Sequence, residues 1–153
     1  MDKIQKVIEH AEKHCKAHGA RLTNKRKQVL SGLLHAPKAL SAYELMDYCK
    51  AEFDENIPAM SVYRILDFFQ DKQLVHKLNL ANKYVACTHI TCDHAHGIPQ
   101  FLICGKCQLV KEISIGEATI AELRKNVEQV GFRLRSPQLE INCICEACTM
   151  DAA

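Results

Sequence analysis

The sequence predicts an α+β chain in two parts, a helical N-terminal part that ends in a β-hairpin and a smaller C-terminal α/β part. Three observations support this fold class. Apolar residues recur at helical spacing in four segments of the first half, two short strand-like runs follow them, and seven of the nine cysteines come after residue 80. The 153 residues suffice for two small domains, which we expect at 1–80 and 81–153.

The first two predicted helices are defined by their apolar faces and their ends. Residues 2–18 form the first, Gly19 ends it, and its inner face carries Ile4, Val7, Ile8, Ala11 and Cys15. Thr23 is a candidate N-cap for the second, which ends before Pro37. The inner face of this second helix carries Val29, Leu30, Leu33 and Leu34.

A capping box and a proline delimit the next two helices. Ser41 and Glu44 have the spacing that lets each side chain bond the other residue's backbone N–H, so a third helix begins there. The break at residues 56–58 precedes a fourth helix over about 59–72. Its buried face is expected to comprise Val62, Ile65, Leu66 and Phe69. Its outward face then carries Tyr63, Arg64 and Asp67.

Strand-like runs at 74–78 and 83–87 form a predicted hairpin after these helices. Helices followed by a β-hairpin are the layout of a winged helix-turn-helix. In the remaining sequence we expect a second unit with strands at 101–104 and 109–113, a helix at about 117–130 and a strand at 132–141. The sequence thus predicts an N-terminal winged helix-turn-helix followed by a small α/β domain.

Composition excludes several classes of protein. With 48% hydrophobic and 25% charged residues the chain is not wholly disordered. No apolar run approaches the roughly 20 residues of a membrane-spanning helix, and the N-terminal segment has no apolar core of a secretory signal. We therefore expect a cytoplasmic protein with no membrane partner. In that compartment thiols stay reduced, so nine cysteines favour metal binding over disulfides.

Two Cys-x-x-Cys pairs are the most specific chemical signal in the sequence. Four thiolates suit the tetrahedral shell of a structural zinc ion, and the 37 residues between the pairs leave room for a helix and a returning strand. A redox-active dithiol and an iron–sulfur cluster are the alternatives, and Cys143 is interpreted as a bystander. The four predicted ligands are Cys104, Cys107, Cys145 and Cys148.

A second group of potential ligands surrounds the predicted junction between the two domains. His76 and Cys87 lie on the two strands of the hairpin and can approach each other across the ladder. A mixed nitrogen, sulfur and oxygen set suits zinc, although each loop histidine taken alone reads as an ordinary surface residue. The complete group is His76, Cys87, His89, Cys92, His94, His96 and Glu112.

The outer surface of the helical domain carries basic and aromatic residues. Lys25, Arg26 and Lys27 lie near a helix start, where phosphates are well accommodated. Arg64 can pair with a guanine edge, and Tyr63 can reach a thymine methyl group or a phosphate. From charge alone, with a net charge of only +2, an ordinary solvated helix face explains these residues better than a DNA-binding surface does.

Four motifs occur in the order found in the ferric uptake regulator (Fur) family of bacterial repressors, and the chain resembles that family over nearly its whole length. Within the family, the resemblance is strongest to the zinc-sensing branch. Short segments point to that branch, among them Tyr84–Cys87 and Val110–Glu112. The four motifs are Arg21–Arg26, Ser61–Leu66, Cys104–Cys107 and Cys145–Cys148. Departures from the family pattern are Asn24, Ser61 and a longer loop before Cys104.

The resemblance implies a DNA-binding winged helix and a C-terminal domain that forms a homodimer. Carried over by position, the two Cys-x-x-Cys pairs match the structural zinc ligands. The regulatory zinc ligands would be His76, Cys87, Glu112 and His96, with His94 or His89 as possible substitutes for His96. Residues expected to bind DNA are Ser61, Tyr63, Arg64, Lys25, Arg26 and Lys27.

The sequence and the resemblance together predict a zinc-responsive dimeric repressor with two zinc ions per subunit. It would bind palindromic operators of zinc-uptake genes when the regulatory site is filled. No small-molecule substrate beyond the metal ion is expected, and no catalytic arrangement stands out, so an enzyme is not expected. The alternatives are a regulator of the same family that senses iron, manganese, nickel or peroxide, and a zinc–thiol redox or metal-carrier protein.

Overall fold

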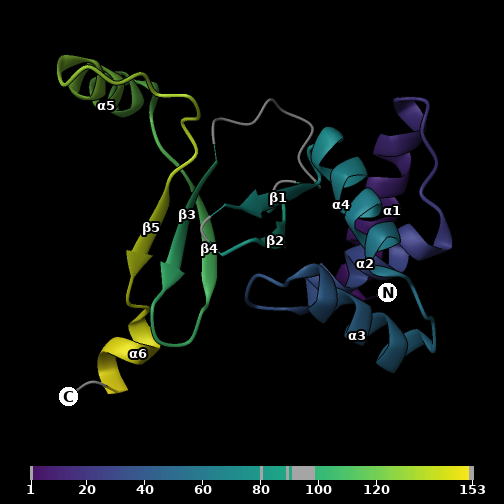
Figure 1. Cartoon of the computed structure of the whole chain (residues 1–153). Coiled ribbons are helices and arrows are strands. Elements are labelled where there is room, and N and C mark those ends of the chain that lie inside the picture. Colours follow the sequence, from purple (N-terminus) through teal and green to yellow (C-terminus); the bar gives the residue numbers. More distant parts are fainter. Residues whose placement is uncertain (1, 80, 89, 91–98, 152–153) are drawn as a thin grey trace. The chain divides into compact units, whose positions relative to one another are not determined.

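The computed structural model describes residues 2–79, 81–88, 90 and 99–151 (Figure 1). Contacts divide the chain into two compact units, Met1–Asp93 and His94–Ala153. The sequence placed the boundary after residue 80, but the strand after that residue pairs with the strand before it, so the whole hairpin belongs to the first unit. None of the described helices is both long and apolar enough to cross a membrane.

The described residues of the first unit form four helices and a hairpin. Its helices match the sequence prediction to within a residue or two at their ends, because the apolar faces and the caps at Thr23 and Ser41 fall where the pattern places them. The elements are α1 (Lys3–Ala17), α2 (Asn24–His35), α3 (Ala42–Phe53), α4 (Ala59–Asp71), β1 (Val75–Leu78) and β2 (Lys83–Ala86).

Side-chain caps define the starts of α1, α2 and α3. Thr23 accepts a hydrogen bond from the Arg26 backbone N–H, as predicted for the start of α2. Ser41 and Glu44 form the predicted capping box, with both hydrogen bonds at 3.1 Å. Helix α4 differs, because Pro58 occupies its N-cap position and no side chain caps its first turn. The first backbone N–H groups of α4 therefore lack a side-chain acceptor.

The helices of the first unit enclose one apolar core. Cys15 is fully buried in it, which confirms its interpretation as a small core residue. On α4, the residues Val62, Leu66 and Phe69 are buried, and Ile65 is half-buried. Because this face of α4 is fixed by the core, the opposite face of the helix is fixed toward the surface.

The hairpin gains a third short segment from the connection between α2 and α3. Strands β1 and β2 pair antiparallel, with His76 opposite Val85. Leu40 and Tyr84 exchange two backbone hydrogen bonds of 3.0 and 2.8 Å, so the connection pairs with β2. Helices followed by this small sheet form the predicted winged helix-turn-helix.

The second unit is built on a three-stranded sheet in the order β4-β3-β5. Strand β3 pairs antiparallel with β4 and parallel with β5, and Figure 1 shows β3 between its two neighbours. Among the described residues of this unit, only Gln100, Phe101, Cys104 and Ile120 are buried. The elements are β3 (Pro99–Cys104), β4 (Val110–Ser114), α5 (Glu117–Gln129), β5 (Glu140–Cys143) and α6 (Glu146–Asp151).

The predicted strand over 132–141 was too long at its start, and only residues 140–143 form β5. The buried Gln100 side chain explains the difference. Its amide nitrogen donates to the Pro137 carbonyl at 2.8 Å, and its amide oxygen accepts from the Leu139 N–H at 2.6 Å. The Gln100 side chain thus occupies backbone groups at residues 137 and 139 that a longer β5 would have paired with the backbone of β3.

Candidate metal centres and nucleic-acid interface

Four cysteine sulfurs of the second unit converge at one end of its sheet. Cys104 ends β3 and pairs with Cys143, the last residue of the parallel strand β5. Because parallel strands end at the same edge, the two Cys-x-x-Cys turns that follow them meet there. The sulfurs of Cys104, Cys107, Cys145 and Cys148 all lie within 4.8 Å of one another.

The sulfur spacing suits a tetrahedral zinc site. Four zinc–sulfur bonds of about 2.3 Å place the sulfurs about 3.8 Å apart, and the Cys107 and Cys145 sulfurs are 3.7 Å apart. That distance also excludes a disulfide, in which the sulfurs are about 2 Å apart. The residues present therefore fit a zinc ion, as the spacing of the two pairs predicted.

Backbone groups favour a thiolate at Cys104. Hydrogen bonds from the backbone N–H groups of Cys107, Cys145 and Lys106 lower the pKa of the Cys104 thiol to about 6. The N–H of Cys145 lies 3.4 Å from that sulfur. Hydrogen bonding with Cys145, together with burial, raises the pKa of Cys148 to about 12. Some protons therefore remain on the cluster at neutral pH, and metal binding would displace them.

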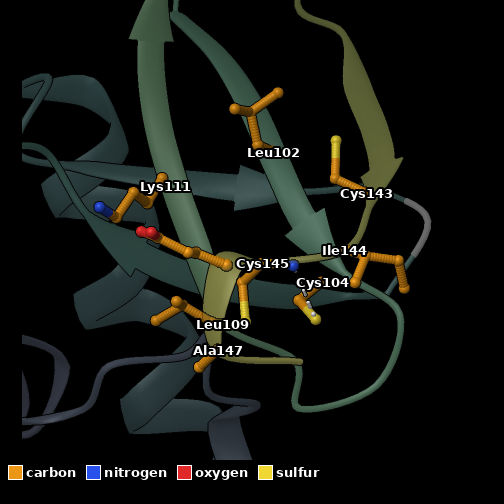
Figure 2. A pocket seen from close by; sticks show the side chains of 9 residues that line it. Leu102, Cys104, Leu109, Lys111, Cys143, Ile144, Cys145 and Ala147 are labelled. Atoms are coloured by element: carbon orange, nitrogen blue, oxygen red, sulfur yellow. Dashed lines mark hydrogen bonds between the residues drawn. The ribbon is translucent and has the colours of Figure 1, made fainter. Parts of the chain in front are cut away.

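A pocket of about 270 Å³ adjoins the cysteine cluster (Figure 2). Its apolar wall includes Leu102, Leu109 and Ile144. Figure 2 shows the sulfur of Cys143 directed away from the sulfurs of Cys104 and Cys145. Cys143 does not belong to the group of four converging sulfurs, which agrees with its interpretation as a bystander.

A second pair of ligand-type side chains lies on the hairpin of the first unit. The Cys87 N–H donates to the Leu74 carbonyl at 2.9 Å, which extends the β1–β2 ladder by one pair. His76 is two residues beyond Leu74, so its side chain shares a sheet face with Cys87. A ring nitrogen of His76 and the sulfur of Cys87 lie within 4.8 Å of each other. Cys87 is buried and His76 is half-buried.

The other predicted regulatory ligands lie either on the second unit or outside the described residues. Glu112 is half-buried on β4 of the second unit, opposite Phe101 of β3. The remaining candidates lie outside the described residues, and these are His89, Cys92, His94 and His96.

The outward face of α4 carries the side chains predicted to contact DNA. Arg64 and Asp67 are exposed, whereas Tyr63 is half-buried and packs against the core with its apolar ring. Ser61 is also half-buried. Sequence reasoning did not single out Met60, which precedes Arg64 by one helical turn and is 64% exposed. The sequence does show that Met60 and Arg64 are four residues apart, which places them on the same face of a helix.

The three basic residues at the start of α2 are in different environments. Lys25 is exposed. The guanidinium of Arg26 lies 3.8 Å from the centre of the Phe68 ring and donates to the Arg21 carbonyl. Lys27 forms an ion pair of 3.0 Å with Glu12 of α1. Two of the three charges are therefore already engaged within the first unit.

Comparison with known proteins agrees with these features. The sequence pattern of the ferric uptake regulator family matches residues 16–142. The zinc uptake regulation protein of Escherichia coli K12 is 34% identical over 144 residues, which are 94% of this chain and 82% of that protein. The ferric uptake regulation protein of Staphylococcus aureus is 28% identical, over 90% of this chain and 95% of its own.

A solved zinc uptake regulator in complex with zinc and DNA superposes with a TM-score of 0.84 at 30% identity, and the match covers all of both chains. The holo form of XcZur gives a TM-score of 0.75 at 31% identity, over 94% of this chain and 96% of that one. The fold, the two cysteine pairs and the match over most of the sequence lead to one conclusion: this chain belongs to the ferric uptake regulator family.

Proposed function

We propose that this protein is a zinc-responsive dimeric repressor that binds palindromic operators of zinc-uptake genes. The observation that carries the proposal is the His76–Cys87 pair on the wing of a winged helix. A thiolate and an imidazole together suit zinc, and their place in the predicted DNA-binding domain would couple metal binding to DNA binding. Similarity to a regulator complexed with zinc and DNA supports the same function.

The four-cysteine cluster would hold the first of two zinc ions per subunit. Few residues are buried among the described part of the second unit, and a small core of this kind commonly depends on a metal for its stability. The cluster cross-links the ends of β3 and β5 through Cys104, Cys107, Cys145 and Cys148. Its role in the proposal is therefore to maintain the fold of the second unit.

The second zinc ion would be the signal. We assign its ligands to His76 and Cys87 of the first unit and to Glu112 of the second, with His96 as the fourth and His94 or His89 as substitutes. Because these residues belong to different units, filling the site would link the two units. Shifting a two-state equilibrium from 1:99 to 99:1 requires about 5.5 kcal/mol, and structural zinc binding supplies roughly 10–16 kcal/mol.

The first unit would contact DNA through the outward face of α4. An arginine on a recognition helix can make two hydrogen bonds to a guanine edge, and Arg64 is exposed on that face. Ser61 and Tyr63 would contribute from the same helix, and Lys25 would neutralise a phosphate. The Arg26 guanidinium contacts Phe68 and the Lys27 ammonium contacts Glu12. These two residues would therefore contribute to DNA binding through their positive charge rather than through a direct phosphate contact.

A second copy of the chain would cover the apolar surface of the second unit. Phe132 is 72% exposed, and Val130, Ile113 and Ile141 are also exposed. Large exposed apolar side chains at this density are typical of an interface rather than of a free surface. A dimer with two-fold symmetry presents two recognition helices to two half-sites, which is why a palindromic operator is expected. A protein with these partners would work in the cytoplasm without catalysing a reaction.

The test is selection of DNA from fragmented genomic DNA by the purified protein, with trace free zinc and again with a strong zinc chelator. Recovery of a short palindrome only with zinc is the expected result. Recovery in both conditions would show that DNA binding does not depend on zinc, so that zinc is not the effector. If no DNA is recovered although the protein carries metal, the redox or metal-carrier function replaces this one.

A further inference from the structure

The outward face of α4 contains one apolar side chain where the neighbouring positions are polar. Met60, Arg64 and Asp67 follow one another at spacings of four and three residues, so they share one face of the helix. All three are exposed, and Met60 is 64% exposed. Among the described residues of the first unit, the other exposed large apolar side chains are Tyr43 at 62% and Phe53 at 42%, both on α3.

Core packing does not account for Met60. The buried face of α4 is completed by Val62, Leu66 and Phe69, and Met60 is absent from the side chains that pack against the core. Because Met60 is 64% exposed, it contributes little apolar burial to the stability of the fold. The fold therefore does not require an apolar side chain there, and its place on the outward face leaves it accessible to a partner.

The first turn of α4 is suited to approach nucleic acid. No acidic residue lies in this turn, and no side chain caps it. Its free backbone N–H groups and the positive end of the helix dipole favour nearby phosphates. In helix-turn-helix proteins the N-terminal residues of the recognition helix contact the base edges in the major groove. Met60 occupies the second position of α4.

We propose that Met60 determines base specificity by packing against the 5-methyl group of a thymine in the major groove. This assignment rests on the proposed function as a DNA-binding repressor. The thymine methyl is the apolar group that the major groove displays, and methionine adapts its shape to such a contact. Four residues of α-helix span about 6 Å, so the thymine lies within about two base pairs of the base contacted by Arg64.

The experiment uses the zinc-loaded protein and the duplex that it selects. Each thymine of the half-site is replaced in turn by deoxyuracil, symmetrically in both half-sites, so that only the methyl group is removed. Dissociation constants are measured by fluorescence anisotropy for the wild type, Met60→Ala and Met60→Leu. Met150→Ala is the matched control, because Met150 is comparably exposed in the second unit.

At one thymine position the wild type should bind the uracil duplex about fourfold more weakly per half-site, or about fifteenfold for the palindrome. Met60→Ala should bind both duplexes equally, at the level of the wild type on uracil. Met60→Leu and Met150→Ala should retain the discrimination. Arg64→Ala should weaken binding to both duplexes by the same factor, since it contacts a different base.

Equal uracil penalties in the wild type and in Met60→Ala at every position would overturn the assignment while leaving the proposed function intact. The absence of any penalty in the wild type would do the same. If the wild type selects no DNA at all, the proposed function fails first and the assignment fails with it. Because Met60 is exposed, unchanged thermal unfolding of Met60→Ala is expected and serves as the folding control.

Discussion

At the scale of single residues, two neighbouring basic side chains at the start of α2 have different roles. Lys25 is exposed at the start of α2, whereas the guanidinium of Arg26, next in the chain, lies over the Phe68 ring. A cation above an aromatic ring contributes about 0.5–2 kcal/mol. The charge of Arg26 therefore stabilises the first unit, and the charge of Lys25 remains available for a phosphate.

We expect Arg26→Ala to lower the free energy of unfolding by about 0.5–2 kcal/mol, and Lys25→Ala to leave it unchanged. Lys25→Ala should instead weaken DNA binding about equally for all sequences and reduce the slope of log affinity against log salt by about 1. Denaturant unfolding and binding at several salt concentrations measure the two effects. An unchanged salt slope for Lys25→Ala would show that it makes no phosphate contact.

A second prediction at this scale separates two cysteines. Cys87→Ser should reduce the zinc content from two to one per subunit and abolish zinc-dependent DNA binding, because a hydroxyl replaces the thiolate beside His76. Cys143→Ser should keep both zinc ions, since Cys143 lies outside the group of converging sulfurs. Metal analysis after removal of free zinc measures both variants. Two zinc ions in Cys87→Ser would exclude Cys87 as a ligand.

At the scale of elements, the capping box of α3 combines a local and a tertiary contact. The hydrogen bond from the Ser41 N–H, with contributions from Lys83 of β2, holds the pKa of the Glu44 carboxyl below its usual value of 4.5. Because the pKa is lowered in the folded state, Glu44 stabilises the fold above pH 4.5. That stabilisation is lost as the pH falls through the lower, folded-state pKa.

Ser41→Ala should therefore cost about 1 kcal/mol of stability at pH 7. Glu44→Gln should also be destabilising at pH 7, with a difference from the wild type that shrinks as the pH falls below 4.5. Glu52→Gln is the control, because Glu52 is exposed on the same helix. Denaturant unfolding from pH 7 to pH 3 gives the comparison. A difference for Glu44→Gln that is constant with pH would contradict the role of its carboxylate.

The elements also show which features local sequence can predict. Helices α1 to α5 follow from apolar periodicity, and the starts of α2 and α3 follow also from the caps at Thr23 and Ser41. The start of β5 could not be predicted, because the Gln100 side chain from a distant strand bonds the segment before it. Likewise, the sequence places three basic residues at α2, but only the folded neighbours Phe68 and Glu12 show which two are engaged.

At the scale of the whole molecule, the two units have different sources of stability. The first unit has an extensive apolar core, while few of the described residues of the second unit are buried. We therefore expect Cys104→Ser to lose the structural zinc and the dimer, with the first unit still folded. Sedimentation velocity should show a monomer, and circular dichroism should retain most of the helical signal. A zinc-free variant that remains dimeric would contradict the structural role of the cluster.

The parallel pairing of β3 with β5 also has a consequence for the rate of folding. The strands join residues about forty positions apart in the chain, whereas only four residues, 79–82, separate β1 from β2. Closing a longer loop costs more chain entropy before any contact compensates for it, so structures with distant pairings fold more slowly. During refolding the first unit should acquire its structure early, and the second should follow in a separate, later phase whose rate depends on the metal concentration.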